Sequence, residues 1–364
     1  MFNLKSNRYV GIELLRIIAM LMVFNLHFFI KGQYYKSSNQ IVNIESWIVI
    51  CFSVVAVNCY VLISGYFMVD KSFKLSRLTN TYSQMWFYSV ATFVLMIILG
   101  YTKLSIGNIF LSITPFIHNS YWFVTSYLLL LLFTPLLNSA INNMSKSKLK
   151  LIIFLLVGVF SVFNNVVKVI NPIDNTAGYG VLWFIVLYLS AAYLKKYYIP
   201  NNKPLKWFVY YGITVVLNFA FHTIFGKYGQ VWEVSMVRDY NNILVYAGAM
   251  FLFLLFININ ITSSVVKNIV LFFSPLTFAV YLIHESPFVY PVLWKLINVG
   301  NYCTDNALFI FMAMGTIILL FIAFCLIELA RQLLFKLLKF NKIINNGSMY
   351  IESKVKKLIL RSRI

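Results

Sequence analysis

The sequence predicts an all-α, polytopic membrane protein with about ten transmembrane helices. Of its 364 residues, 61% are hydrophobic and only 11% are charged, whereas a soluble domain carries about 25% charged residues. Long apolar runs alternate with short polar stretches along the whole chain, which is the pattern of a protein that crosses a bilayer repeatedly. The net charge of +20 would suggest nucleic acid in a soluble protein. Here the positive-inside rule explains it, and no nucleic-acid partner is expected.

Ten segments are each close to the ~20 residues that cross a hydrocarbon core. They are residues 10–30, 46–68, 81–101, 120–140, 149–168, 179–197, 207–226, 240–258, 267–291 and 307–330. With the N-terminus inside, the inner loops and tail hold 22 Lys and Arg residues, the outer loops hold 7, and Arg16 stays within the membrane. This bias predicts that both termini are cytoplasmic. Glu13 and Arg16 interrupt the first segment, which is also too long for a cleaved signal peptide.

The chain divides into a membrane domain, residues 1–330, and a basic cytoplasmic tail, residues 331–364. The tail begins as an amphipathic basic stretch, Leu333 to Phe340, and we expect it to lie on the anionic inner leaflet. Between the third and fourth spans, Leu104 to Ile117 is apolar but too short to cross, so it predicts an interfacial or re-entrant helix on the outer side.

The first apolar segment carries two residues that are rare inside a membrane. It reads Glu13-Leu-Leu-Arg16, and ten residues then separate Arg16 from His27. A buried arginine is costly, so it is rarely an accident. Eleven residues make close to three helical turns, which places both side chains on one face, about 16 Å apart along the axis. We infer a site on this face, with a route leading to it.

All four histidines fall in the outer half of the membrane under this topology: His27, His118, His222 and His284. A neutral imidazole can accept a proton from a hydroxyl group at pH 7, so each is either a general base or an ordinary interfacial histidine. Glu285 directly follows His284. Because adjacent helical residues point about 100° apart, we expect these two not to pair with each other. One would face an outer cavity while the other braces a neighbouring helix.

Two pairs of residues three apart mark the inner side. Glu13 and Arg16 can pair on one helix face, which either fixes helix packing alone or holds Arg16 to meet an anionic ligand. Lys74 and Arg77 precede the third span. Cations at such a place usually determine topology, but they would also clamp a phosphate-bearing donor entering from the cytoplasm.

The second span closes on Ser64-Gly65-Tyr66. A glycine there lets a backbone or a thin ligand approach closely, and the two hydroxyls can donate hydrogen bonds. The alternative is the small-residue packing that is common between membrane helices.

Together these residues resemble the acyltransferase-3 family of membrane proteins. The Arg16-x10-His27 spacing resembles its signature, although many members have Asp where this chain has Glu13. Ser64-Gly65-Tyr66 and the pair Lys74/Arg77 are similar to family motifs at the same places. Further similar stretches are Tyr121-Trp122-Phe123, Thr134-Pro135-Leu136-Leu137 and the run from Ser274 through Tyr281 to His284. The resemblance covers about residues 10 to 330, in the expected order.

The resemblance implies an O-acyltransferase that moves an acyl group, most often acetyl, from cytoplasmic acyl-CoA to a hydroxyl of an extracytoplasmic surface polysaccharide or other glycan. His27 would be the general base, with Arg16 and its partner Glu13 positioning the donor arm. The donor would be held by Lys74, Arg77, Ser64, Gly65 and Tyr66, and the outer cavity would be lined by His284, Glu285, Trp122 and Tyr281. Some members carry a fused extracytoplasmic esterase-like domain. This chain ends about 34 residues after its last span, so we expect direct transfer by a stand-alone enzyme.

Other classes remain open at this stage. A polysaccharide flippase or polymerase would also be polytopic and basic, but usually has longer outer loops. A secondary transporter could use Glu13 and Arg16 as an ion-coupling pair, but would show broken helices near the midplane. We expect no bound metal or cofactor, since the four cysteines lack metal-ligand spacing. The Asn-, Ile-, Lys- and Tyr-rich composition suggests an AT-rich bacterial genome and hence a bacterial cytoplasmic membrane.

Overall fold

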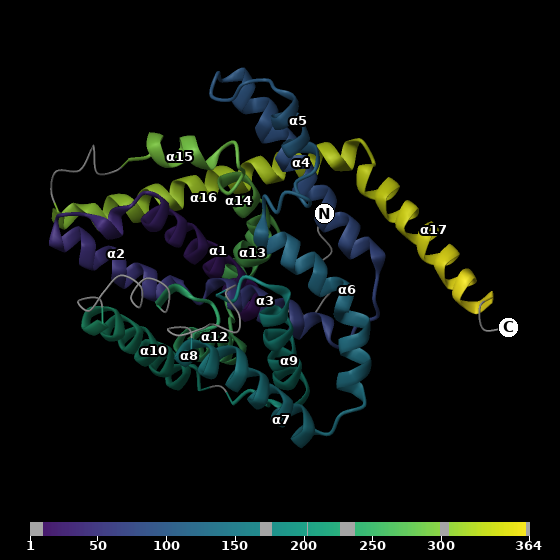
Figure 1. Ribbon diagram of the computed structural model, residues 1–364, viewed down its shortest axis with the longest axis horizontal. Helices are drawn as coiled ribbons and strands as arrows, with labels where there is room; N and C mark the ends of the chain where they lie inside the picture. The colour runs from purple at the N-terminus through teal and green to yellow at the C-terminus, as the bar shows by residue number, and fades with distance from the viewer. Residues whose placement is uncertain (1–9, 168–176, 202, 226–236, 299–305, 362–364) are drawn as a thin grey trace.

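The computed structural model describes residues 10–167, 177–201, 203–225, 237–298 and 306–361 (Figure 1). All the regular secondary structure in these residues is helical, which confirms the all-α prediction. Lys5 and Arg8, which the topology places inside, and the predicted span ends at 168 and 226 lie outside the described residues.

The helices follow one another along the whole chain. The first group is α1 (Val10–Lys31), η1 (Tyr34–Lys36), α2 (Gln40–Ser53), α3 (Ala56–Met68), α4 (Leu75–Ile98), α5 (Ile106–Ile113), α6 (Trp122–Asn142), α7 (Lys146–Val157), the π-helical η2 (Gly158–Phe163) and α8 (Asn164–Val167). The second group is α9 (Val181–Tyr197), α10 (Pro204–Phe225), α12 (Ile243–Asn258), α13 (Ser264–Phe273), η4 (Ser274–Leu276), α14 (Thr277–His284), α15 (Tyr290–Leu296), α16 (Asn306–Leu337) and α17 (Phe340–Arg361).

Among the described residues, seven helices are long and apolar enough to cross a membrane. They lie at Val10–Lys31, Gln40–Met68, Leu75–Ile98, Trp122–Asn142, Pro204–Phe225, Ser264–His284 and Leu308–Leu337. The three other predicted spans correspond to α7–η2–α8, α9 and α12. The last two have 17 and 16 residues, which is at the short limit for a span. Both are largely buried within the bundle, so they need not meet lipid along their whole length. The count of ten remains a prediction.

Local sequence explains where several helices begin and bend. Side chains of Asn39, Ser105, Ser145, Asn242 and Ser263 accept hydrogen bonds from the first backbone N–H groups of the helices that follow them, which are otherwise unpaired. Inside α6, Pro135 cannot donate to the carbonyl of Leu131. The Thr134 hydroxyl donates to that carbonyl instead, at 2.7 Å, so the helix continues through the proline.

Helix α1 is the centre of the bundle. It contacts α2, α3, α12, α13, α14 and α16, and Figure 1 shows it between α16 on one side and α2 on the other. A helix that is apolar around most of its circumference is stable only when it is surrounded. The polar exceptions on α1 therefore lie inside the protein, where they must find partners.

The C-terminal segment differs from the predicted amphipathic start of the tail. Helix α16 runs unbroken across residue 330 to Leu337, and the chain turns at Lys339 (φ 53°) before α17 begins. The helix α17 packs against the start of α4. Ser348 and Thr79 share a hydrogen bond of 2.8 Å, and the Glu352 carboxylate accepts one from the backbone N–H of Leu75. Polar contacts between helices thus hold the tail, in addition to any contact with lipid.

Candidate active site

Four side chains form one stripe along α1. Arg16, Met20, Val23 and His27 follow each other at steps of four, three and four residues, which keeps them on one helix face. At the inner end, Arg16 Nε donates to Glu13 Oε2 at 3.1 Å, as the spacing of three residues predicted. Arg16 and His27 both line cavities, so the predicted face of α1 carries the site.

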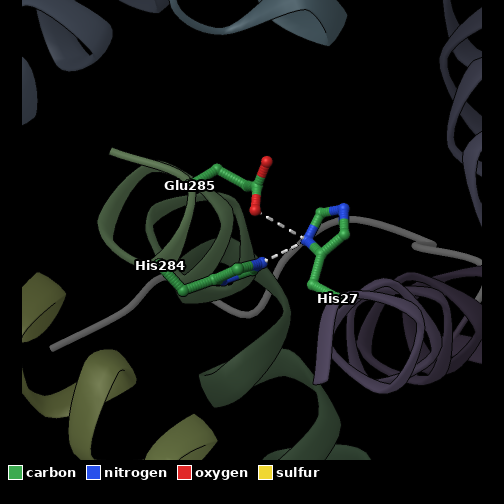
Figure 2. A group of neighbouring side chains, drawn as sticks. All are labelled: His27, His284 and Glu285. Carbon is green, nitrogen blue, oxygen red and sulfur yellow. Dashed lines mark hydrogen bonds and ion pairs between the residues drawn. The ribbon is translucent and has the colours of Figure 1, made fainter. Parts of the chain in front are cut away.

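His27 is held through one ring nitrogen only (Figure 2). Its Nδ1 lies 2.8 Å from His284 Nε2 and 3.2 Å from Glu285 Oε1. The residues come from α1 and from the end of α14, more than 250 positions apart in sequence. The other nitrogen, Nε2, points away from both partners in Figure 2 and makes no hydrogen bond to any described residue.

The hydrogen-bond pattern fixes where the protons sit on the two neutral imidazoles. His284 Nδ1 lies 2.5 Å from the backbone oxygen of Val280, which can only accept, so Nδ1 carries the hydrogen. His284 Nε2 is then an acceptor, and His27 Nδ1 must donate to it and to Glu285. The free lone pair of His27 is consequently on Nε2. A histidine whose Nδ1–H is held by acceptors is set up as a base at Nε2.

His284 and Glu285 reach the same atom because the helix ends between them. Pro287 has no N–H and disfavours a helical conformation in the residue before it. The helix α14 ends at His284, and Glu285 has φ −95° and ψ 1°, outside the helical register. The predicted span to residue 291 is therefore too long. The 100° step between adjacent helical residues therefore does not apply to His284 and Glu285. Both side chains contact His27.

Lys31 also belongs to this network. Its position in the sequence marks it only as one of the seven cations predicted for the outer loops. Its Nζ lies 2.5 Å from Glu285 Oε1 and 4.3 Å from the centre of the Tyr290 ring. Lys31 is one turn after His27 on α1, so the same helix supplies two hydrogen-bond donors to the carboxylate. The i,i+4 spacing of His27 and Lys31 was visible in the sequence. Their common partner was not, because it comes from α14.

The outer cavity is small, with a volume of about 20 Å³, and His27 lies in its wall. Trp122 and Tyr281, both predicted for the outer cavity, line it, and His284 and Glu285 lie behind His27 rather than in the wall. The hydroxyl of Tyr281 is buried and lies near the backbone of Phe123. The complete lining is Met20, Val23, His27, Val57, Tyr60, Trp122, Phe123, Tyr240, Phe278 and Tyr281.

An inner cavity of about 190 Å³ lies further along α1. Arg16 and Ser64 line it, and it shares three aromatic residues with the outer cavity: Tyr60, Phe123 and Phe278. Tyr60 is fixed in place, since its hydroxyl donates to the backbone oxygen of Arg16 at 2.9 Å. The two cavities therefore meet at an aromatic constriction between the arginine and the histidine.

Ser64, Gly65 and Tyr66, near the end of α3, have three different surroundings in the structure. Ser64 lines the inner cavity. A Cβ on Gly65 would lie 2.9 Å from the Cβ of Ala191, so the glycine allows α9 to approach closely. Tyr66 packs edge-on against Phe253 and beneath the Lys195 ammonium. Of the three, only Ser64 is placed to touch a ligand in the described cavities.

Lys74 and Arg77 lie where α4 begins, outside both cavities. Lys74 is the residue before the first helical turn, and its side chain makes no capping hydrogen bond there. Neither cation forms an ion pair with a described residue. Their position at the start of α4 fits both predicted roles, which are setting the topology and binding the phosphates of a donor.

His27, His284 and Glu285 could also hold a metal ion by position alone, because their ligand atoms all lie within 4.8 Å of one another. The 2.8 Å contact between the two rings and the Lys31 contact to Glu285 already satisfy these atoms. The hydrogen-bonded arrangement thus accounts for the cluster. The expected lack of a metal stays a prediction.

Apolar helices, an internal histidine with one ring nitrogen held by hydrogen bonds and two adjacent cavities define a multi-pass membrane protein with a candidate internal site. The family model of an acyltransferase domain, that of the acyltransferase-3 family, matches residues 9–328. The chain therefore belongs to this family, and it is a membrane acyltransferase. No curated protein and no solved structure matches the chain.

Proposed function

We propose that this acyltransferase moves an acyl group, acetyl in the first instance, from cytoplasmic acyl-CoA to a hydroxyl group of an extracytoplasmic glycan. The observation that carries the proposal is the orientation of His27, whose Nδ1–H is held while Nε2 is left for the cavity. The cavity leads through the aromatic constriction to Arg16, so a donor from one side and an acceptor from the other can meet at the histidine.

In the proposed reaction, His27 Nε2 takes the proton of the acceptor hydroxyl as its oxygen attacks the thioester carbonyl carbon. The C–S bond then breaks, and the CoA thiolate leaves with the proton from Nε2. The imidazolium that forms in between is stabilised by Glu285, which sits 3.2 Å from His27 Nδ1. Atoms and charge balance without a further reagent.

Tyr281, Arg16 and Trp122 also have proposed roles. The Tyr281 hydroxyl in the cavity wall would donate to the oxyanion that develops on the thioester oxygen. Arg16, held by Glu13, would position the donor arm in the inner cavity. The aromatic wall at Trp122 suits a sugar ring, whose C–H faces pack on aromatic rings.

The test is proton NMR of purified surface polysaccharide from a strain lacking the protein, complemented with wild type, His27→Ala or His118→Ala. His118 is an exposed histidine that packs edge-on against Phe110, so it is the matched control. Acetyl methyl signals should be lost on deletion and return with wild type and His118→Ala only. Unchanged acetylation in the deletion strain would contradict the acetyl or glycan assignment. A collapse in glycan yield would favour a flippase or polymerase.

A further inference from the structure

A third cavity lies beyond the two that contain Arg16 and His27. It has a volume of about 460 Å³ and is formed by the loop between α3 and α4 together with the end of α6. We call it the inner-face cavity, because the topology places this loop on the cytoplasmic side. Its lining is Val69, Asp70, Lys71, Ser72, Phe73, Pro135, Asn138 and Asn142.

The inner-face cavity is aligned with the other two along α6. Phe123 and Tyr127 line the inner cavity, and Asn138 and Asn142 line the inner-face cavity. Tyr127 and Asn138 are eleven residues apart, close to three turns, so they share one helix face about 16 Å apart. Helix α3 runs beside this face, with Ser64 in the inner cavity and Val69 following its end in the inner-face cavity. The spacing suits an extended ligand that continues from one cavity to the next.

The polar atoms of the inner-face cavity are held in a defined way. Asn138 donates to the backbone oxygens of Met68 and Lys71 and accepts from the Tyr188 hydroxyl at 2.6 Å, so it shapes the loop. Lys196 donates to Asn142 Oδ1 at 2.7 Å. Because an ammonium can only donate, the oxygen of Asn142 must face it, and the Nδ2 group remains a donor. Nδ2 makes no hydrogen bond within the described part of the chain.

Aromatic and charged groups complete the inner-face cavity. Phe73 has 37% of its surface exposed, although it is a large apolar residue in a loop. Lys71 is in the wall, and Lys196 is bound to Asn142. Arg77 lies within electrostatic range of the Tyr188 hydroxyl that holds Asn138, as does Asp70. The wall thus carries one ammonium, Lys71, and one carboxylate, Asp70, which can accept from a ribose hydroxyl or an exocyclic amine.

We propose that the inner-face cavity binds the nucleotide portion of acyl-CoA. Phe73 stacks on the adenine, Asn142 Nδ2 donates to a ring nitrogen, and Lys71 with Arg77 binds the phosphates. The pantetheine arm then follows the α6 face into the inner cavity. This inference rests on the proposed function for its donor. It assigns the donor's nucleotide to Phe73, Lys71 and Asn142, none of which the sequence analysis singled out.

The experiment compares two donors on the purified full-length protein, acetyl-CoA and S-acetylpantetheine, which lacks the nucleotide. Phe73→Ala and Asn142→Ala should each lower kcat/KM for acetyl-CoA by about tenfold, the order expected for one lost stacking or hydrogen-bonding partner. Activity with S-acetylpantetheine should change less than about twofold. Phe110→Ala and Asn143→Ala are the controls. Phe110 is exposed on α5, and the Asn143 amide donates to the backbone oxygen of Ser139.

Binding of adenosine 3′,5′-bisphosphate to the same proteins gives a readout that does not need turnover. Wild type should bind it, measured by calorimetry in detergent, and the double variant Phe73→Ala/Asn142→Ala should bind at least tenfold more weakly. Equal binding by both, or equal loss of activity with both donors, would overturn the inference. Failure of wild type to use either donor, with the nucleotide still bound at this cavity, would instead overturn the proposed function.

Discussion

The outer and inner ends of the α1 stripe are built differently. At the outer end, His27 Nδ1, His284 and Glu285 form a closed set of hydrogen bonds that Lys31 completes. At the inner end, Arg16 has one partner, Glu13, and the cations Lys71, Lys74 and Arg77 form no ion pair with the residues that the structure describes. The contrast separates two tasks. A proton transfer needs one fixed geometry, whereas a charged, flexible donor can be captured by cations that stay adaptable.

This comparison predicts that substitutions at the outer end lower kcat and those at the inner end raise KM for the donor. The largest effect is expected for His27→Ala, because it removes the base itself. We expect kcat to fall about 10³-fold, with KM for acetyl-CoA unchanged within about threefold, in steady-state assays of released thiol. A loss confined to KM would contradict the role of His27 as the base.

Tyr281→Phe should have the next largest effect. The change removes a buried hydroxyl near the backbone of Phe123 and leaves the ring in place, so stability should fall little. We expect kcat to fall about 10²-fold if the hydroxyl stabilises the oxyanion. Tyr121→Phe is the matched control, since that hydroxyl is also buried and lies near Ser286 and Thr92 but does not line the outer cavity. Equal effects of the two changes would remove Tyr281 from the mechanism.

Lys31→Met and Glu285→Gln should each lower kcat about tenfold, and the double variant should be little worse than either single one. Lys31 has no contact with the cavity and acts through Glu285, so the two effects should not add. Lys36→Met is the control, because Lys36 is an outer lysine over the Tyr35 ring. Additive losses in the double-mutant cycle would mean that Lys31 has a separate role.

At the inner end, Arg16→Gln should raise KM for acetyl-CoA about fivefold and leave kcat largely intact. The guanidinium lines the inner cavity about three turns from His27, too far to touch the reacting atoms. Arg16→Lys keeps the charge and should recover part of the affinity. A fall in kcat equal to that of His27→Ala would show that both ends serve the chemical step.

The smallest effect is expected for metal removal. Treatment with 1,10-phenanthroline or EDTA should leave the rate within about 20% of the untreated enzyme, since hydrogen bonds satisfy the His27 cluster without an ion. Metal analysis of the purified protein is the direct check. Stoichiometric zinc, with activity lost on chelation and restored on its return, would replace the base mechanism with a metal-assisted one.

Much of the site could be predicted from sequence because it lies on one helix. The register of Arg16 and His27 follows from helical periodicity alone, and so does the Glu13–Arg16 pair. Trp122 and Tyr281, which line the outer cavity, were predicted from the family resemblance. The prediction that His284 and Glu285 face different surroundings was wrong. It used the 100° step of a helix interior, but the helix ends at His284, before Pro287.

The sequence by itself determined the membrane class, the all-helical fold and the stripe on α1, since these depend on apolar length, charge bias and a local repeat. Tertiary structure alone decided which nitrogen of His27 is held by hydrogen bonds and which is left for the proposed base role. It brought His284 and Glu285, at the end of α14, to one atom of α1, and it placed two cavities on either side of Tyr60, Phe123 and Phe278. These contacts join residues far apart in the chain, and helical periodicity relates only residues within one helix.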